Sequence, residues 1–196
     1  MPAGRKLGFD PDEVIASAMR VFWERGYTAT TKTDIEAATG IARSSLANTF
    51  GSKEDLFYTC VDAFLDLLLA GVQSRLVDRG GGLSDVEAYF EAVAAETLGR
   101  DGPRGCLIVK TMMASTECPP TEAQMGRYRS GMIAGFVAAL ERSARLGEIA
   151  EGTIPGRAEL LFMWFNALHM TADSALASTV DQQLAAVRTA LREWAA

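Results

Sequence analysis

The chain contains one histidine, His169, and three cysteines among its 196 residues. Three scattered thiols argue against a disulfide framework. A single histidine supplies too few ligands for a zinc site, and no nucleophile motif accompanies it to complete a hydrolytic centre. For His169 we favour a structural or dimer-interface role over contact with a ligand, and catalysis comes last. We therefore expect a protein that is not an enzyme and holds no metal or cofactor.

Long apolar segments are also missing. No apolar run reaches the ~18 residues of a membrane span, and the first residues, MPAGRKLGFD, have no signal-peptide core. The sequence shows no internal repeat and none of the alternation of apolar and polar residues that marks a strand. Its 48% hydrophobic and 22% charged residues are typical of a globular protein rather than a disordered one. We expect a cytoplasmic all-α protein.

The net charge of −6 is distributed unevenly. Residues 1–53 hold seven Lys and Arg against six Asp and Glu, a balance of +1. Residues 54–196 hold twelve against nineteen, a balance of −7. The acidity therefore lies in the longer C-terminal part, and the N-terminal part favours only modest nonspecific attraction to nucleic acid.

Two short helical patterns follow each other within residues 26–56, GYTATTKTDIEAATGIARSSLANTFGSKEDL. Thr33 and Glu36 have the spacing of a capping box, so the first short helix is expected to begin there. Ile35 gives this helix an apolar face. Gly40 follows it and adopts a positive φ at low cost, as a sharp reversal of the chain requires.

The second short helix is expected at about residues 42–50, with Leu46 and Phe50 facing inward. Its other face is polar and mostly uncharged, and it carries Arg43, Ser44, Ser45, Asn48 and Thr49. Such a face suits a DNA groove better than bulk solvent, where Lys and Glu would normally dominate. The two helices together predict a helix-turn-helix.

At these residues the chain resembles the DNA-binding domain of the tetracycline-repressor (TetR/AcrR) family of bacterial transcriptional regulators. The resemblance covers residues 9 to about 57. The positions in step with the family pattern are Gly26, Tyr27, Thr30, Asp34, Ile35, Ala38, Gly40, Ile41, Leu46, Phe50, Lys53 and Leu56. Three positions depart from it. Glu36 replaces a small residue, Ala42 stands where a Ser usually caps the second short helix, and Ala47 stands where a Tyr usually touches a phosphate.

The resemblance implies a homodimeric repressor that binds palindromic double-stranded operator DNA and is released by a small-molecule effector. It implies a DNA-binding domain over residues 1–52 and a ligand-binding and dimerisation domain over residues 53–196. Phosphate contacts are expected from Thr31, Lys32, Thr33 and Lys53, and groove contacts from Arg43, Ser44, Ser45, Asn48 and Thr49. Arg43 has the geometry to pair with a guanine edge. The arm of residues 1–8, with Arg5 and Lys6, lies near the duplex or is a disordered terminus.

Nine helices are expected in all. Asp10 caps the first, which begins at Pro11 and ends at Gly26. The two short helices come next, and a long helix is expected at about residues 53–77. Ser84 and Glu87 form a capping box for a helix to about residue 98. The remaining helices are expected at about residues 104–115, 121–146, 155–177 and 181–194.

The dimer prediction depends on the last two of these helices. Leu184, Val187, Leu191 and Trp194 recur at three- and four-residue steps, as in a coiled-coil seam. The preceding helix contains ELLFMWFNALHM, residues 159–170, which is apolar around most of its circumference. A four-helix bundle with a second copy would bury both helices. The predicted interface residues are Leu161, Leu168, Leu184, Val187, Leu191 and Trp194. The alternative is that both helices pack only on their own core.

A mostly apolar ligand pocket is predicted between helices of the C-terminal part, where methionines and aromatic residues gather. The candidate lining residues are Phe64, Leu68, Phe90, Cys106, Lys110, Met113, Met125, Tyr128, Met132, Phe165 and His169. Each of them also has a simpler explanation as a core or solvated residue. Lys110 has the charge to orient an anionic or carbonyl group.

Cys106 supports a rival hypothesis. It follows Arg104 and Gly105 near the start of a helix, where the positive helix end and the arginine would favour a thiolate. The protein would then be a DNA-binding sensor of oxidants or electrophiles, whereas the simpler alternative is a buried small residue. A second rival is a helical enzyme or apolar-ligand carrier without a DNA role, and the pattern of residues 26–56 argues against it.

Overall fold

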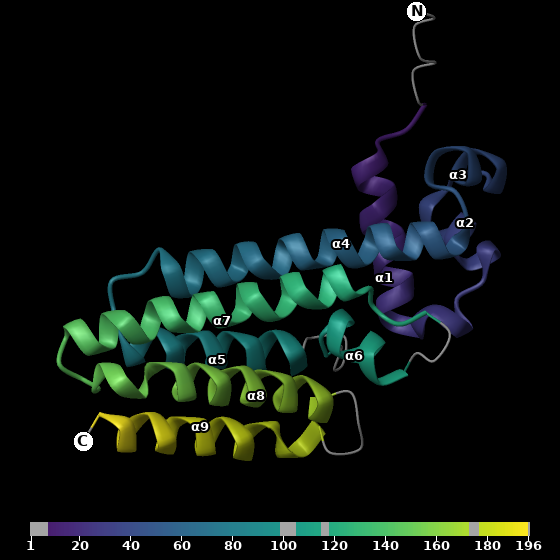
Figure 1. The fold of residues 1–196 in the computed structure, drawn as a ribbon. Helices are drawn as coiled ribbons and strands as arrows, with labels where there is room; N and C mark the ends of the chain where they lie inside the picture. Colours follow the sequence, from purple (N-terminus) through teal and green to yellow (C-terminus); the bar gives the residue numbers. More distant parts are fainter. Residues whose placement is uncertain (1–7, 99–104, 115–117, 173–176, 196) are drawn as a thin grey trace, which may run out of the picture.

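The computed structural model describes residues 8–98, 105–114, 118–172 and 177–195 (Figure 1). Within these ranges the chain forms nine α-helices and no strand, which confirms the predicted fold class. The helices are α1 (Pro11–Ala29), α2 (Lys32–Thr39), α3 (Arg43–Phe50), α4 (Lys53–Val72), α5 (Leu83–Leu98), α6 (Leu107–Ala114), α7 (Glu122–Arg145), α8 (Ile154–Ala172) and α9 (Val180–Trp194). Shorter turns are the π-helical η1 (Gln73–Val77) and the 3-10 turns η2 (Glu151–Thr153) and η3 (Ala177–Thr179). In the part of the chain described, no helix is both long and apolar enough to cross a membrane.

The ends of α1 follow the sequence signals. Asp10 caps the helix by accepting a hydrogen bond from the backbone N–H of Asp12 at 2.9 Å, and Pro11 occupies the first turn. Gly26 breaks the helix with φ 75° and ψ 170°, as expected, but one further helical turn follows it to Ala29. The predicted arm with Arg5 and Lys6 lies outside the described residues, as do Pro103 and Arg104.

The cap of α2 differs from the prediction. Thr31, not Thr33, is the N-cap residue: the backbone N–H of Asp34 donates to Thr31 Oγ1 at 3.2 Å, and the N–H of Thr31 donates to Asp34 Oδ2 at 2.8 Å. The capping box thus begins two residues earlier, because aspartate serves at the third position as well as glutamate does. Glu36 is left for another partner.

The start of α5 also differs. The helix begins at Leu83, so Ser84 lies inside its first turn and is not the cap. The backbone N–H of Leu83 instead donates to Glu148 Oε2 at 2.9 Å. Glu148 lies in the connection that follows α7, so a side chain distant in sequence satisfies this helix end, and no local pattern could reveal it.

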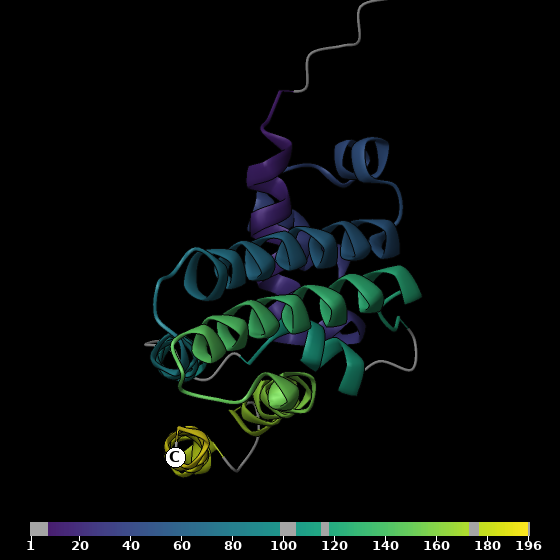
Figure 2. The ribbon, with the colours of Figure 1, turned by 60° about the vertical axis from the view of Figure 1, so that its left-hand side comes forward.

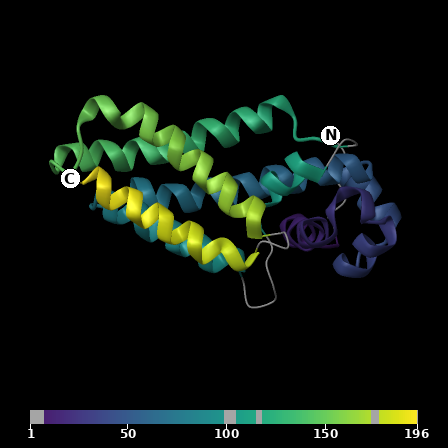
Figure 3. The same cartoon turned by 90° about the horizontal axis from the view of Figure 1, so that it is seen from below.

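The helices stack in layers (Figure 1). The long helix α4 lies along α7, and α5, α8 and α9 follow beneath them, while α1, α2 and α3 gather at one end. Viewed after a turn about the vertical, α8 and α9 lie at the edge opposite α3 (Figure 2). From below, α8 and α9 lie in front of the bundle, and the α1–α3 group projects from one end (Figure 3).

Glycines on α7 bring α4 close to it. A Cβ added at Gly135 would overlap the side chain of Val72, and one added at Gly131 would overlap Leu69. The two helices therefore approach more closely than larger residues would allow. At the far end of α4, Arg142 donates to the backbone carbonyls of Leu76 and Gly81 and so fixes the turn that follows the helix.

Candidate DNA-binding face and ligand cavity

The helices α2 and α3 form a helix-turn-helix. On its inner side, one buried apolar residue from each helix packs into the core. Ile35 of α2 is 2% exposed and Leu46 of α3 is 7% exposed. Between them Gly40 adopts φ 70° in the left-handed region, as the turn requires. The outer side of α3 exposes Arg43, Ser44, Ala47 and Asn48, whereas Ser45 and Thr49 are half-buried. The polar face predicted from the sequence is therefore directed to solvent.

Arg43 is held against α2. Its Nε atom lies 2.8 Å from Glu36 Oε2, and its Nη2 atom donates to Thr33 Oγ1 at 2.7 Å. Both charged side chains are exposed, so the ion pair contributes little to folding stability. It does hold the guanidinium at the start of α3, beside Glu36 and Thr33 of α2.

Lys53 ties the DNA-binding end of the chain to α4. Its ammonium group donates to the carbonyls of Tyr27 and Thr30, each at 3.0 Å, and lies 4.0 Å above the centre of the Tyr27 ring. An ammonium has three N–H donors, so one remains for an additional acceptor. The predicted phosphate contact of Lys53 would thus add to a structural role.

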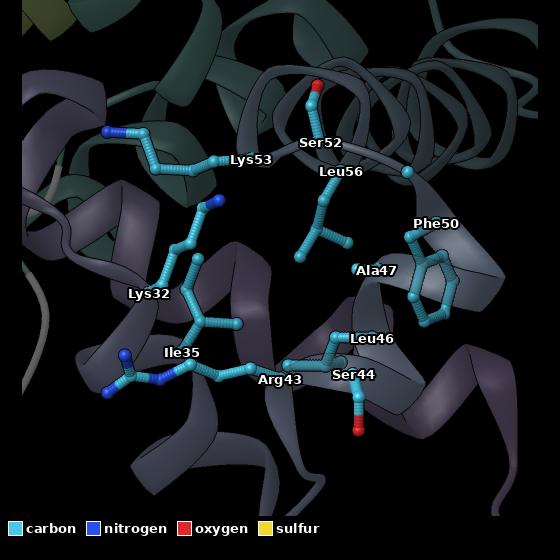
Figure 4. Close-up of a pocket in the computed structure, with 11 residues that line it drawn as sticks. Lys32, Ile35, Arg43, Ser44, Leu46, Ala47, Phe50, Ser52, Lys53 and Leu56 are labelled. Carbon is cyan, nitrogen blue, oxygen red and sulfur yellow. The ribbon is translucent and has the colours of Figure 1, made fainter.

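A hollow of about 320 Å³ opens between α2, α3 and the start of α4 (Figure 4). Ile35, Leu46 and Leu56 point into it from its apolar side, and the cationic side chains of Lys32 and Arg43 lie at its rim. Ala47 also lines this space, and its methyl group leaves most of the hollow unfilled.

A second cavity, of about 240 Å³, lies where α1 meets the helical bundle. Its walls come from the four helices α1, α4, α5 and α8, from η1 and from the residues that precede α6. The lining residues are Trp23, Phe64, Leu67, Leu68, Gly71, Arg75, Tyr89, Val93, Glu96, Thr97, Gly105, Cys106, Phe165 and His169. Most of this wall is aromatic or aliphatic, which suits a small apolar ligand.

Aromatic contacts fix the wall of this cavity. The ring of Trp23 meets Phe64 edge-on at 5.1 Å between centroids, and Tyr89 stacks on Phe165 at 6.2 Å. His169 packs edge-on against Phe165 at 4.5 Å, and its Nδ1 atom lies 3.2 Å from Thr97 Oγ1. Burial lowers the pKa of His169 to about 4, so its imidazole is neutral at physiological pH.

Comparisons with known proteins agree with this arrangement. Residues 14–59 match the model of the bacterial regulatory proteins, tetR family. The HTH-type transcriptional repressor ComR of Escherichia coli (strain K12) is 34% identical over 107 residues, 54% of this chain and 51% of ComR. The uncharacterized HTH-type transcriptional regulator YezE of Bacillus subtilis (strain 168) is 31% identical over 125 residues, 64% of this chain and 63% of YezE. The matches thus span between half and two-thirds of these curated relatives.

Solved structures extend the likeness to the whole fold. The TetR family transcriptional regulator CifR, in a cysteine mutant complexed with 26bp double-strand operator DNA, has a TM-score of 0.77 and 27% identity. That match covers 97% of this chain and 100% of CifR. The chain thus resembles TetR-family regulators both in its N-terminal sequence and in its overall fold. The reduced form of Escherichia coli NemR has a TM-score of 0.74 at 16% identity, covering 93% and 94% of the two chains, and so shows the shared fold alone.

The structure brings five of the predicted pocket residues together around the second cavity: Phe64, Leu68, Cys106, Phe165 and His169. The other six lie elsewhere. Phe90, Tyr128 and Met132 are fully buried in the core without lining the cavity. Lys110 donates to the carbonyl of Trp23 at 3.0 Å, and Met113 and Met125 line an open hollow of about 650 Å³ between α6, α7 and α8.

Trp23 was missed by sequence reasoning, because it lies on a helix assigned to DNA binding. It follows Phe22, which belongs to the buried stripe of α1. A large aromatic residue beside that stripe is the signal that could have found it. No comparable sequence signal places the polar residues Thr97, Arg75 and Glu96 in the cavity wall, since polar residues on a helix are most often solvated.

Cys106 is a buried small residue, the simpler of its two interpretations, and the rival thiolate is not favoured. Cys106 is 2% exposed, and burial raises the pKa of its thiol to about 11. The backbone N–H groups of Ile108 and Val109 at the start of α6 act in the opposite direction, but burial outweighs them. A thiol that stays protonated reacts slowly with oxidants and electrophiles, so the cysteine-sensor hypothesis loses its support.

The predicted dimer-interface residues are mostly buried within the protomer. Leu161, Leu168, Leu184, Val187 and Leu191 are between 0% and 9% exposed. The seam of α9 packs on α5 and α8, which accounts for its coiled-coil spacing. Trp194 is half-buried and stacks on Trp164 at 5.5 Å. We therefore propose a different surface for a partner.

That surface is the outer stripe of α8. Leu160 is 41% exposed, Met163 61% and Met170 44%, and these positions recur on one side of the helix. Large apolar side chains that gather in this way on a surface are a common sign of a protein contact.

Proposed function

We propose that this chain is a TetR-family transcriptional repressor that binds palindromic operator DNA as a homodimer in the cytoplasm and is released by a small molecule. One observation carries the proposal: α3 is anchored on its inner side by Leu46 and presents a polar, groove-sized outer face. The likeness to CifR, whose structure was solved in complex with operator DNA, and to the repressor ComR supports it.

The proposed division of labour on the DNA follows from side-chain chemistry. Arg43 reads a guanine edge after exchanging Glu36 for the base, while Ser44 and Asn48 contact neighbouring base edges. Thr31, Lys32, Thr33 and Lys53 bind phosphates at the margins of the groove, and Ser45 and Thr49 complete the contact as the half-buried members of α3.

Homodimerisation is proposed through the exposed stripe of α8, Leu160, Met163 and Met170, together with the adjacent Trp164–Trp194 pair. A second copy would remove this apolar surface from water. It would also supply a second α3, and two copies related by a two-fold axis read half-sites about 34–36 Å apart.

Release by an effector is proposed to begin at the cavity behind α1. Trp23 and Phe64 form part of its wall, so a bound molecule touches both the helix that supports the helix-turn-helix and the long helix α4. A ligand that binds better when α1 and α4 are displaced shifts the population away from the DNA-binding state, by its differential affinity alone.

Arg43→Ala tests the proposed function. Binding is measured by gel shift, at one fixed salt concentration, with the DNA upstream of the chain's own coding region and with a random duplex of equal length. The wild type should prefer the upstream DNA. Arg43→Ala should lose about 1–3 kcal/mol of that preference, since a bidentate base contact disappears.

Arg145→Ala provides the matched control, because it removes the same charge at the far end of α7. It should leave the preference intact. If Arg43→Ala lost the same affinity for both duplexes, Arg43 would not contact a base. If the wild type bound both duplexes equally well, the proposal of operator binding itself would be overturned.

A further inference from the structure

One polar group in the cavity behind α1 is unsatisfied. Within the described part of the chain, the Tyr89 hydroxyl is buried and has no hydrogen-bond partner. The residue is 3% exposed and lines the cavity. A buried hydroxyl without a partner costs about 1–3 kcal/mol, so a folded chain that keeps one has a use for it or tolerates a destabilised site.

The Tyr89 ring is fixed in place by its neighbours. It stacks on Phe165 and meets Phe90 and Phe136 edge-on, with centroids 6.0 and 5.8 Å away. Burial holds the pKa of Tyr89 far above its usual range, so the hydroxyl keeps its proton and can donate it to an acceptor. The side chain is therefore a rigid donor, oriented before any ligand arrives.

The two charged side chains of the cavity wall are paired with each other. Arg75 Nη2 lies 2.5 Å from Glu96 Oε1, and both side chains are partly exposed, which places the pair at the cavity rim. His169 is neutral and its Nδ1 is engaged by Thr97. Among the described residues that line the cavity, none offers an unpaired charge to a ligand. An ionic ligand would lose its hydration without gaining a counter-charge.

We propose that this cavity binds a small, uncharged, mostly apolar molecule with a carbonyl, ester or ether oxygen that accepts a hydrogen bond from the Tyr89 hydroxyl. Its apolar part lies against Trp23, Phe64 and Phe165. The volume of about 240 Å³ favours a small molecule over a long lipid. The inference rests on the proposed function, because it names the chemical class of the effector.

Three probes with the same eight-carbon chain separate the alternatives: octan-2-one, octanoate and octylammonium. Binding of each to the full chain without DNA is measured by isothermal titration calorimetry, and by the shift in melting temperature. Octan-2-one should bind and raise the melting temperature, whereas the two ions should bind at least tenfold more weakly, because the cavity has no unpaired charge. Equal or tighter binding of either ion would overturn the proposal.

Tyr89→Phe should weaken octan-2-one binding about five- to tenfold, the size expected for one hydrogen bond. Its own melting temperature should not fall, because the hydroxyl that is removed has no partner. Tyr58→Phe is the matched control: its hydroxyl donates to the carbonyl of Pro119 at 3.2 Å, away from the cavity. This control should leave octan-2-one binding unchanged. Unchanged affinity in Tyr89→Phe would refute the role of Tyr89.

The gel shift with upstream DNA keeps the two proposals separable. A chain that binds octan-2-one through Tyr89 but shows no preference for upstream DNA would retain the ligand class and lose the regulatory function. A chain that prefers upstream DNA but binds none of the three probes would remain a DNA-binding regulator, and the ligand class proposed here would be wrong.

Discussion

The proposed DNA-binding face and the ligand cavity differ in their polarity and in how far apart their residues lie in the sequence. The face consists of two eight-residue helices that are adjacent in sequence, with Ile35 and Leu46 buried and charged or polar groups outside. The cavity is assembled from segments between Trp23 and His169, and its walls are mostly aromatic. Changes at the face should therefore alter DNA binding with little effect on stability, whereas removal of a packed ring from the cavity wall should lower stability.

The largest effect is expected from Phe165→Ala in the cavity wall. Phe165 is 0% exposed and contacts both Tyr89 and His169. Removing a buried aromatic ring costs about 3–5 kcal/mol in the free energy of unfolding. Urea denaturation measures this change. A loss below 1 kcal/mol would show that the wall is not part of the folding core, and the contrast between the two regions would fail.

A smaller loss of folding stability is expected when the pH is lowered. The pKa of His169 is about 4 in the folded chain and near 6.5 when exposed, so the unfolded chain binds the proton first. The stabilisation is complete above pH 6.5 and is lost as the pH falls toward 4, by up to about 3 kcal/mol. His169→Gln cannot titrate, so its melting temperature should fall less steeply over this interval. Equal slopes in the two proteins would contradict the burial of His169.

The smallest effect is expected from a substitution at the proposed DNA-binding face. Glu36→Gln releases Arg43 and removes a negative charge beside the duplex, so operator affinity should rise about two- to fivefold. The melting temperature should hardly move. Glu193→Gln on α9 makes the same change in net charge far from α3 and should leave affinity unchanged. Equal gains in both variants would show that net charge, rather than the Glu36–Arg43 pair, limits binding.

The difference between the two regions also explains what the sequence could predict. Gly40 and Leu46 lie within one short segment, and the local spacing of such residues is enough to define a helix-turn-helix. The number of helices and most of their approximate ends were predicted for the same reason, since a cap such as Asp10 is a local signal.

Features that depend on distant partners were not predicted. The start of α5 is satisfied by Glu148, some sixty-five residues away in sequence. A reactive thiol at Cys106 stayed open as a rival hypothesis because its helix position is visible in the sequence, whereas the burial that raises its pKa is not. Trp23 joined the cavity only because α1 packs across α4. Long-range packing, rather than local pattern, decides such positions.

The close approach of Val72 to Gly135 would make this point the pivot of α4 in the proposed release. Phe64, in the cavity wall, lies about 12 Å along the helix from that point, and Lys53, which binds the carbonyls at the end of α1, lies about 29 Å from it. A displacement of Phe64 about this pivot would be magnified more than twofold at Lys53. In the proposed release, a molecule in the cavity would thus move the segment that holds the DNA without touching the DNA.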